Sequence, residues 1–368
     1  MKVFHIISRL DIGGAERVAL NIASTHQTDV EMHLVEVVRA HDEVTKSLLA
    51  ECRENGIQVH RFVFPNWNFH YLPQKIAAWM FPLWFVWVFL RYRPDVLHSH
   101  TEIPDLAVYS FCRFFPWLGK RVRIVRTIHN NVLWSGMHRT GRWVERFMQA
   151  RKANVAISRS VKESYEKAYG EGVETLIYNG VEAPAVKVNG ERLRVNGERA
   201  FRVLFAGRWE QQKGIETLAD IVRMADAEKW HFTLVGSGRQ ADLIYDVANG
   251  RGNVVVRTSI PSLVSHLSEY DFVLMPSLFE GLPLLAIEAG MAAVPVLANR
   301  APGLTETLPE DWPLMVNGNS RSEWKALLER IEQGVDKDAL GVRLQQFACE
   351  HFSLETMQRA YETLYRCL

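Results

Sequence analysis

Two glutamates, Glu280 and Glu288, lie in a stretch of this chain that is otherwise almost entirely apolar. Glu280 lies in a Gly/Pro loop beside Gly281 and Leu282, and Glu288 is the one charged residue in the apolar run 282–293. An isolated buried carboxylate is costly unless something satisfies it, so we expect either a buried polar group or a ligand to meet Glu288. An ionised carboxylate only accepts hydrogen bonds, which suits the hydroxyl groups of a sugar or a ribose.

The sequence FAGRWEQQKG places two cations, Arg208 and Lys213, just beyond the end of an apolar strand. Two such cations can neutralise a diphosphate without a metal ion, although a solvated loop with chance charges would look the same. Pro283 suits the first turn of a helix, whose free backbone N–H groups favour phosphate. Together these features predict a site for a phosphorylated ligand, with carboxylates close to its hydroxyl groups.

Glycines follow two other strands. Gly236 opens the pattern G-x-G-x-x-A, which ends at Ala241 and lies between a strand and a helix, as in dinucleotide-binding turns. The next strand ends in Arg257 rather than in an acidic residue, so we do not expect an NAD site but a turn near a nucleotide in another pose. Gly13 and Gly14 either allow close approach of a ligand or form a plain tight turn.

Histidines gather in the first half of the chain, but their spacing does not predict a metal site. His98 and His100 share one face of a strand, and His129 ends another strand. A metal site would need a third ligand at a known spacing as well as carboxylates. The sequence Asp-Lys-Asp at 336–338 lies in a late polar helix, and the four cysteines have no metal-binding spacing. We therefore expect a metal-independent site, and a reducing compartment.

Strands alternate with helical segments in both halves of the chain, which predicts parallel sheets with helices on both faces. A polar segment at 184–200 with two Asn-Gly pairs reads as a linker between the halves. We expect an α/β protein with two Rossmann-like domains facing across a cleft and ligands at the carboxyl ends of the strands. The expected strands cover 2–8, 31–38, 95–100, 123–129, 154–158 and 175–180, then 201–208, 231–238, 253–258, 271–277 and 294–299.

Charge is distributed unevenly although the net charge of the chain is only +1. Residues 113–167 contain 13 Lys and Arg against three Asp and Glu. The uncharged run 77–90, AAWMFPLWFVWVFL, is rich in Trp and Phe and contains Pro82. It is shorter than the roughly 20 residues of a spanning helix, so it is either a core helix or a surface that dips into the bilayer interface. Anionic headgroups would attract the neighbouring basic residues.

In their order along the chain, these motifs resemble the GT-B fold retaining glycosyltransferases of family 4. The resemblance covers almost the whole chain. It rests on GGAE at 13–16, NGVE at 179–182, FAGRWEQQKG, Glu-x7-Glu at Glu280 and Glu288, GLTE at 303–306 and the closing helix HFSLETMQRAYETLY. It implies an acceptor-binding domain over 1–183, the linker 184–200, a nucleotide-sugar domain over 201–350 and a C-terminal helix, 351–368, that packs back on the first domain.

The resemblance also implies roles for individual residues. Glu280, His129, Lys213 and Arg208 would be the catalytic residues, with the two cations on the diphosphate, Glu280 on the hydroxyls of the donor sugar and Glu288 on the ribose. Other donor-binding positions would be Gly13, Gly14, Gly236, Gly281 and Leu282, and His100, Asn130 and Glu16 would lie on the acceptor side. The family's usual Phe-x-Gly beside the base is replaced by Arg-Thr-Ser at 257–259.

We therefore expect retaining transfer from a nucleotide sugar, with UDP favoured, to a glycan or a lipid-linked glycan in cell-surface polysaccharide assembly such as capsule or lipopolysaccharide. The expected location is the cytoplasm, with peripheral contact at the inner face of an anionic membrane, and no nucleic acid or cofactor is expected as a partner. The alternatives are a GT-B sugar-nucleotide epimerase, which needs no acceptor surface, and a non-catalytic GT-B partner subunit, which need not retain all four charged residues.

Overall fold

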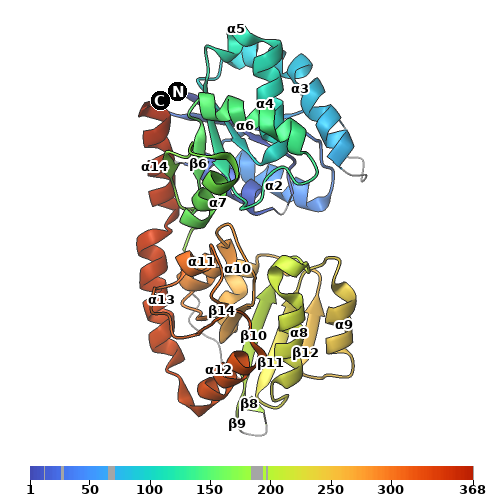
Figure 1. Cartoon of the computed structure of the whole chain (residues 1–368), viewed down its shortest axis with the longest axis vertical. Coiled ribbons are helices and arrows are strands. Elements are labelled where there is room, and N and C mark those ends of the chain that lie inside the picture. Colours follow the sequence, from blue (N-terminus) through green and yellow to red (C-terminus); the bar gives the residue numbers. More distant parts are fainter. Residues whose placement is uncertain (12, 26–28, 65–70, 184–193, 196–197, 368) are drawn as a thin grey trace. The chain divides into compact units, whose positions relative to one another are not determined.

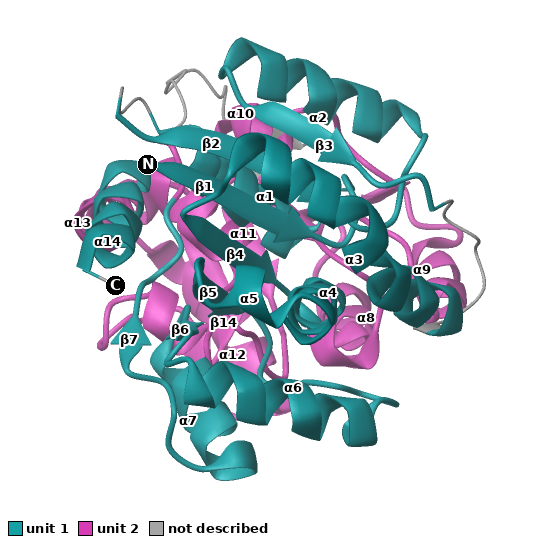
Figure 2. Ribbon diagram, turned by 90° about the horizontal axis from the view of Figure 1, so that it is seen from above, with its two compact units in different colours: residues 1–180, 354–368 teal, residues 181–353 magenta. Residues whose placement is uncertain are grey.

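The computed structural model describes residues 1–11, 13–25, 29–64, 71–183, 194–195 and 198–367 (Figure 1). The chain divides into two compact units. Unit 1 comprises Met1–Gly180 and Leu354–Leu368, and unit 2 comprises Val181–Ser353 (Figure 2). Each unit contains one fully parallel sheet, so the α/β architecture with two Rossmann-like domains is confirmed.

The sheet of unit 1 has seven strands in the order β3-β2-β1-β4-β5-β6-β7. Its central strands are buried almost throughout, as parallel strands covered on both faces must be. The order reverses between β1 and β4, and this is where open α/β sheets bind ligands. The strands are β1 Lys2–Ile7, β2 Glu31–Glu36, β3 Gln58–Arg61, β4 Val96–His100, β5 Arg123–Ile128, β6 Asn154–Ala156 and β7 Thr175–Leu176.

Helices of unit 1 connect these strands, and the last helix of the chain joins them. This helix, α14 (Leu354–Cys367), packs against α1 and donates from Gln358 Nε2 to the Asn21 carbonyl at 2.7 Å. Its buried side chains are Met357, Tyr361 and Tyr365. The other helices are α1 Gly14–Ala23, α2 Glu43–Glu54, α3 Tyr71–Tyr92, α4 Glu102–Phe114, α5 Pro116–Gly119, α6 His138–Ala150 and α7 Arg159–Tyr169.

The apolar run 77–90 lies within α3, which contains Pro82 and continues through it. One stripe of the helix, including Phe81 and Phe85, is buried against α4. The opposite stripe is exposed, with Trp87 73% and Leu83 59% accessible. The run therefore has a core face, as the core-helix interpretation predicts, and an exposed apolar face, while contact of that face with a bilayer stays a prediction. Among the described residues, no helix is long and apolar enough to cross a membrane.

Unit 2 has a six-stranded parallel sheet in the order β12-β11-β10-β13-β14-β15, which reverses between β10 and β13. Its apolar core includes Trp209, Trp230 and Trp324. The strands are β10 Phe201–Ala206, β11 Trp230–Val235, β12 Val254–Arg257, β13 Phe272–Met275, β14 Val296–Asn299 and β15 Met315–Val316. The α-helices are α8 Ile215–Met224, α9 Ala241–Ala248, α10 Leu263–His266, α11 Leu284–Met291, α12 Arg321–Gly334 and α13 Lys337–His351, with 3-10 turns η1 Gln211–Lys213, η2 Leu267–Glu269 and η3 Thr305–Thr307.

The linker expected over 184–200 lies largely outside the described residues. Within it, β8 (Arg194–Val195) and β9 (Glu198–Arg199) pair as a short antiparallel ladder. The two parallel sheets contain two strands that the sequence pattern did not predict, β3 and β15. Each is an edge strand of its sheet and has at most four residues, which is too short for a clear alternation of apolar and polar side chains.

Candidate active site

The loops after β10 and β13 meet at the point where the strand order of unit 2 reverses. Lys213 Nζ lies 2.6 Å from Glu280 Oε1, and Ser277 Oγ donates to the same carboxylate oxygen at 2.7 Å. The backbone N–H of Leu278 donates to the Gln212 carbonyl, and Gln212 Nε2 donates to the Phe279 carbonyl. Main chain and side chains of the two loops thus hold the predicted cation and carboxylate together.

Glycine is required where these loops cross. Gly214 has φ +67°, and a Cβ on it would lie 2.0 Å from the Pro276 carbonyl oxygen. Gly303, in the motif GLTE, has φ +76°, and its Cβ would lie 2.1 Å from the carbonyl oxygen of Glu280. Any larger residue at either position would force the backbone away from the Glu280 loop.

The burial of the two glutamates differs from the expectation. Glu280 is only 5% exposed, whereas Glu288, midway along α11, is half-buried. The loop of Glu280 folds inward because its N–H donates to the Pro302 carbonyl at 2.9 Å and its carboxylate meets Lys213. The expectation that Glu288 is the buried charge is therefore wrong. Helix α11 is apolar, as its sequence predicts, and the structure shows it packed on α13.

The other predicted donor residues occupy three nearby loops of unit 2. Arg208 is exposed after β10, and its Nη2 donates to Gln212 Oε1 at 3.4 Å. Gly281 and Leu282 precede Pro283, the N-cap residue of α11, and the first turn of this helix has no side-chain cap. Gly236 follows β11 with φ +146°, and its Cβ would lie 1.9 Å from the Gly207 carbonyl oxygen. Gly236 therefore lets the β11 loop approach the loop that carries Arg208.

In unit 1 the predicted residues lie at the ends of β1, β4 and β5. Ser8 Oγ, after β1, and Thr101 Oγ1, after β4, are 3.0 Å apart, which joins the two loops at the reversal of strand order. Gly13 is crowded by the folded-back side chain of Glu16, whose Oε2 lies 1.9 Å from where a Cβ would stand. Apart from the neighbouring residues and the adjacent backbone of α1, no described protein atom lies within 4 Å of such a Cβ on Gly14. Burial raises the pKa of Glu16 to about 6.

Three histidines form a hydrogen-bonded chain that ends at His129. His5 Nδ1 lies 3.1 Å from His100 Nε2, and His100 Nδ1 lies 3.2 Å from His129 Nε2. Burial lowers the pKa of His5 and of His129 to about 3 and that of His100 well below its usual range, so the rings are neutral near pH 7.

The donor and acceptor roles of these three histidines can be assigned by starting from His5, the residue at the end opposite His129. His5 Nε2 is buried without a partner among the described residues. A buried N–H without an acceptor is rarer than an unpaired acceptor, which favours a proton on His5 Nδ1. His5 then donates to His100 and His100 donates to His129 Nε2, so the proton of His129 lies on Nδ1. The chain thereby prepares His129 as a donor.

His98 lies beside this chain and has its own partners. Its Nδ1 is 2.6 Å from the Tyr365 hydroxyl, and its Nε2 is 2.7 Å from Thr127 Oγ1. One ring nitrogen from each of His5, His98 and His100 falls within a 4.8 Å cluster, so the third histidine that a metal site would need is present. However, the cluster contains no carboxylate, and a metal would displace hydrogen bonds that His98 and His100 already make.

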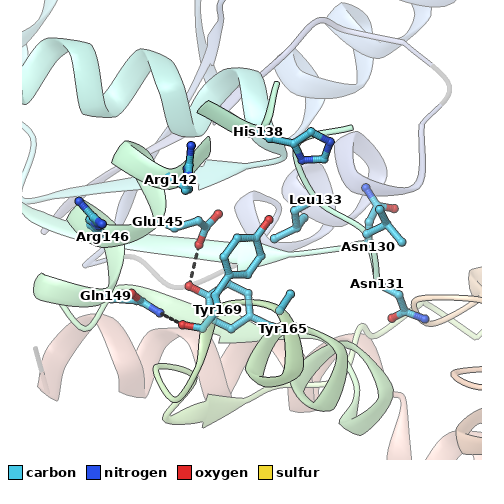
Figure 3. Close-up of a pocket in the computed structure, with 12 residues that line it drawn as sticks. Asn130, Asn131, Leu133, His138, Arg142, Glu145, Arg146, Gln149, Tyr165 and Tyr169 are labelled. Carbon is cyan, nitrogen blue, oxygen red and sulfur yellow. Dashed lines mark hydrogen bonds between the residues drawn. The ribbon is translucent and has the colours of Figure 1, made fainter. Parts of the chain in front are cut away.

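A pocket of about 730 Å³, lined by several charged and polar side chains, lies between the segment 130–133, α6 and α7 (Figure 3). Glu145, Tyr165 and Tyr169 stand between the α6 arginines on one side and Asn130 and Asn131 on the other. The Tyr165 hydroxyl donates to Glu145 Oε2 at 2.6 Å. Asn130, which was predicted on the acceptor side, lines this pocket.

A buried ionic network that the motifs did not reveal supports this pocket. Arg126 makes a bidentate pair with Glu145, both contacts at 2.7 Å, and donates from Nε to Asp105 Oδ2 at 2.7 Å. Burial opposes ionisation of Glu145, but the Arg126 guanidinium outweighs it and lowers the pKa of Glu145. Charged residues inside apolar segments were the available signal, since Arg126 lies within a strand and Asp105 within the apolar helix α4.

Comparisons with known proteins agree with this architecture. Residues 12–183 match the family described as Glycosyltransferase Family 4, and residues 200–333 match Glycosyl transferases group 1. An uncharacterized 41.2 kDa protein in the cps region of Klebsiella pneumoniae is 28% identical over 240 residues, which span 59% of this chain and 63% of that protein. The capsular polysaccharide biosynthesis glycosyltransferase CapH of Staphylococcus aureus is 24% identical over 315 residues, 78% of each chain.

Solved structures share the fold over the whole chain. Anabaena HepE in complex with UDP-glucose superposes with a TM-score of 0.77 at 19% identity, covering 100% of both chains. The lipopolysaccharide outer core galactosyltransferase WaaB superposes with a TM-score of 0.69 at 16% identity, again over both whole chains. At these identities the similarity shows a common fold.

Proposed function

Because this chain belongs to the family 4 glycosyltransferases and is an enzyme of the GT-B fold, we propose that it transfers a sugar from a nucleoside-diphosphate sugar with retention of anomeric configuration. The acceptor would be a glycan or a lipid-linked glycan in cell-surface polysaccharide assembly. A capsular glycosyltransferase among the relatives supports this assignment. A UDP-sugar is favoured, in keeping with the UDP-glucose bound by HepE.

The contact between Lys213 and Glu280 at the strand reversal of unit 2 is the observation that carries the proposal. A diphosphate here would meet Lys213, Arg208 and the uncapped first turn of α11. Glu280, fixed by Ser277 and Lys213, would accept hydrogen bonds from the hydroxyls of the donor sugar. Glu288, half-buried on α11, would accept from the ribose. No metal ion is part of this proposal, because the two cations and the helix dipole supply positive charge.

The proposed chemistry is a front-face substitution in which the leaving diphosphate accepts the proton of the attacking hydroxyl. The bond between the anomeric carbon and the diphosphate oxygen breaks, and the acceptor oxygen bonds to the same face of that carbon. Lys213 and Arg208 would stabilise the charge that develops on the diphosphate. In unit 1, Gly14 would allow backbone approach to the donor, and His129, as an Nδ1–H donor, would hold a hydroxyl of the sugar.

We also place unit 1 at an anionic membrane surface. The exposed stripe of α3 consists of apolar side chains and is flanked by Lys75 and Arg91. Such a stripe buries its apolar side chains among acyl chains while the cations meet anionic headgroups. Liposome flotation tests this placement. Trp87→Ser should lower recovery with anionic vesicles, whereas Val342→Ser on α13, an exposed apolar residue of unit 2, should not.

The experiment that tests the proposed function is a panel of UDP-, GDP- and ADP-sugars, scored by thermal shift and by slow hydrolysis to free nucleoside diphosphate. We expect stabilisation by the UDP series, lost in Glu288→Ala. Stabilisation by the GDP or ADP series instead would leave the proposed transfer reaction in place but change the nucleotide base assigned to the donor. A donor converted into a stereoisomer without acceptor would replace transfer by epimerisation, and no response to any donor would contradict the assignment of the site.

A further inference from the structure

Three neighbouring hollows of unit 1 share residues of α6 and form one continuous surface. The large pocket of about 730 Å³ is lined by Arg142 and Arg146. A small hollow of about 200 Å³ is formed by Arg139, Arg142, Trp143 and Arg146. A third, of about 610 Å³, is formed by Trp143 with Trp79, Tyr109, Arg113 and Phe114. Arginine side chains therefore line one end of this surface, and aromatic side chains line the other.

The arginine side chains of this surface have no acidic side chain paired with them among the described residues. Arg139, Arg142 and Arg146 are spaced three and four residues apart, so they share one face of α6. All three are exposed, and none makes an ion pair or a side-chain hydrogen bond within the part of the chain that the structure describes. Glu145 lies beneath them, but its carboxylate is already engaged by Arg126, Tyr165 and Trp134. Three guanidinium groups thus face the hollows without a protein counter-charge.

The lining of the large pocket adds fixed polar groups to these cations. Tyr165 is only 2% exposed and is held by Glu145 and by Asn154 Nδ2 at 3.0 Å. Gln149 Nε2 donates to the Tyr169 carbonyl at 3.2 Å, which ties α6 to α7 across the pocket (Figure 3). A packed ionic network therefore fixes the wall from which the arginines project, and a preorganised cationic site binds with less loss of side-chain freedom.

The aromatic part begins directly beside the arginines. Trp143 is 54% exposed and Phe114 is 50% exposed, and Phe114 packs edge-on against Trp79 of α3 at a centroid distance of 6.4 Å. Exposed rings in a hollow favour an apolar ligand, and the adjoining guanidinium groups favour phosphate bound in a bidentate manner. The combination suits a molecule with a phosphorylated head and an apolar chain.

We propose that the hollows along α6 bind the acceptor as a phosphate- or diphosphate-linked lipid, with the anionic group on Arg142 and Arg146 and the start of the apolar chain on Trp143 and Phe114. This inference rests on the proposed function, since it names the acceptor class of the same enzyme. The protein would then have two distinct anion sites. The diphosphate of the donor would bind at Lys213 in unit 2, and the phosphate of the acceptor would bind on α6 in unit 1.

The test measures binding of four probes by calorimetry: farnesyl diphosphate, farnesol, inorganic pyrophosphate and UDP. Farnesyl diphosphate should bind more tightly than farnesol or pyrophosphate. Arg142→Gln and Arg146→Gln should each weaken it about tenfold, as expected for loss of one charge-assisted contact. Trp143→Ser should weaken farnesyl diphosphate but leave pyrophosphate unchanged. Arg53→Gln on α2, which removes an exposed arginine that lines none of the hollows, is the matched control.

UDP distinguishes a failure of this inference from a failure of the proposed function. UDP affinity should be unchanged in the α6 variants and reduced in Lys213→Met. Farnesyl diphosphate that binds equally to the wild type, Arg142→Gln and Arg146→Gln would overturn the inference while UDP binding preserved the donor site. Loss of binding to anionic vesicles in these variants, with farnesyl diphosphate unaffected, would also overturn it and assign the arginines to lipid headgroups. Equal thermal unfolding midpoints in all variants would exclude misfolding.

Discussion

Replacing Lys213 by methionine removes the cation that touches Glu280 while keeping most of the apolar side-chain volume. Losing one preorganised electrostatic contact to a leaving group costs about 2.7–4 kcal/mol of barrier, so we expect turnover to fall about 10²- to 10³-fold. Breaking a fully buried ion pair costs about 3–5 kcal/mol of stability. Because the Lys213 side chain is 18% exposed, water compensates part of this loss, and we expect about 1–3 kcal/mol. A domain of ordinary stability survives that change.

The assay is release of nucleoside diphosphate at saturating donor, together with urea unfolding of each variant. Lys229→Met is the control, because Lys229 makes a comparable ion pair with Glu332 at 2.8 Å elsewhere in unit 2. It should lose stability without losing turnover per folded molecule. Glu280→Gln should also be slow, since it removes the charge that orients Lys213 and accepts from the donor sugar.

The double variant separates a catalytic role of Lys213 from a structural one. If the ion pair serves only to hold the two loops, Lys213→Met with Glu280→Gln should recover both stability and turnover relative to Lys213→Met alone. If Lys213 contacts the diphosphate, stability recovers and turnover stays low. Turnover within about threefold of wild type in both single variants would refute the reasoning, since typical losses of such contacts are far larger.

Three further predictions concern unit 1. Burial raises the pKa of Asp105 to about 7, above its unfolded value, so the stability it contributes is full below about pH 4 and is lost as the pH rises toward 7. Asp105→Asn should flatten this fall, worth up to about 4 kcal/mol, in unfolding curves measured from pH 4 to 8. ¹⁵N NMR of labelled histidine should show His129 neutral and protonated on Nδ1 at pH 6, and an Nε2 proton in wild type or a midpoint near 6.5 would contradict the chain from His5. Gly14→Ala should leave the thermal midpoint unchanged and raise the donor KM about tenfold, and an unaltered KM would remove Gly14 from the site.

The elements of the sheets could be predicted well because buried parallel strands are continuous apolar runs between turn residues. The contact of Lys213 with Glu280 follows from the same pattern, because both residues come after strands whose carboxyl ends share one sheet edge. The sequence did not predict that Glu280 is buried. The inward fold of its loop depends on hydrogen bonds to Ser277 in the same loop and to Pro302 in another segment. The roles assigned to these residues stay predictions.

Other residues of the site were not predicted because their partners come from distant parts of the chain. The register of β1 with β4 sets His5 opposite His98, and no local spacing reveals such a partner. Arg126 and Glu145 likewise come from a strand and a helix that meet only in the fold. For α3, an almost uniformly apolar segment carries no periodicity, so its sequence cannot tell which stripe faces the core and which faces outward.

Helix α14 has a consequence for the order in which the protein is made. Its Tyr361 and Tyr365 cover the sheet of unit 1 through Thr127 and His98, yet the ribosome synthesises this helix only after all of unit 2. At roughly 5–20 residues per second, nascent unit 1 must wait on the order of ten seconds with that face unfinished. The first unit to emerge is therefore the last to be completed.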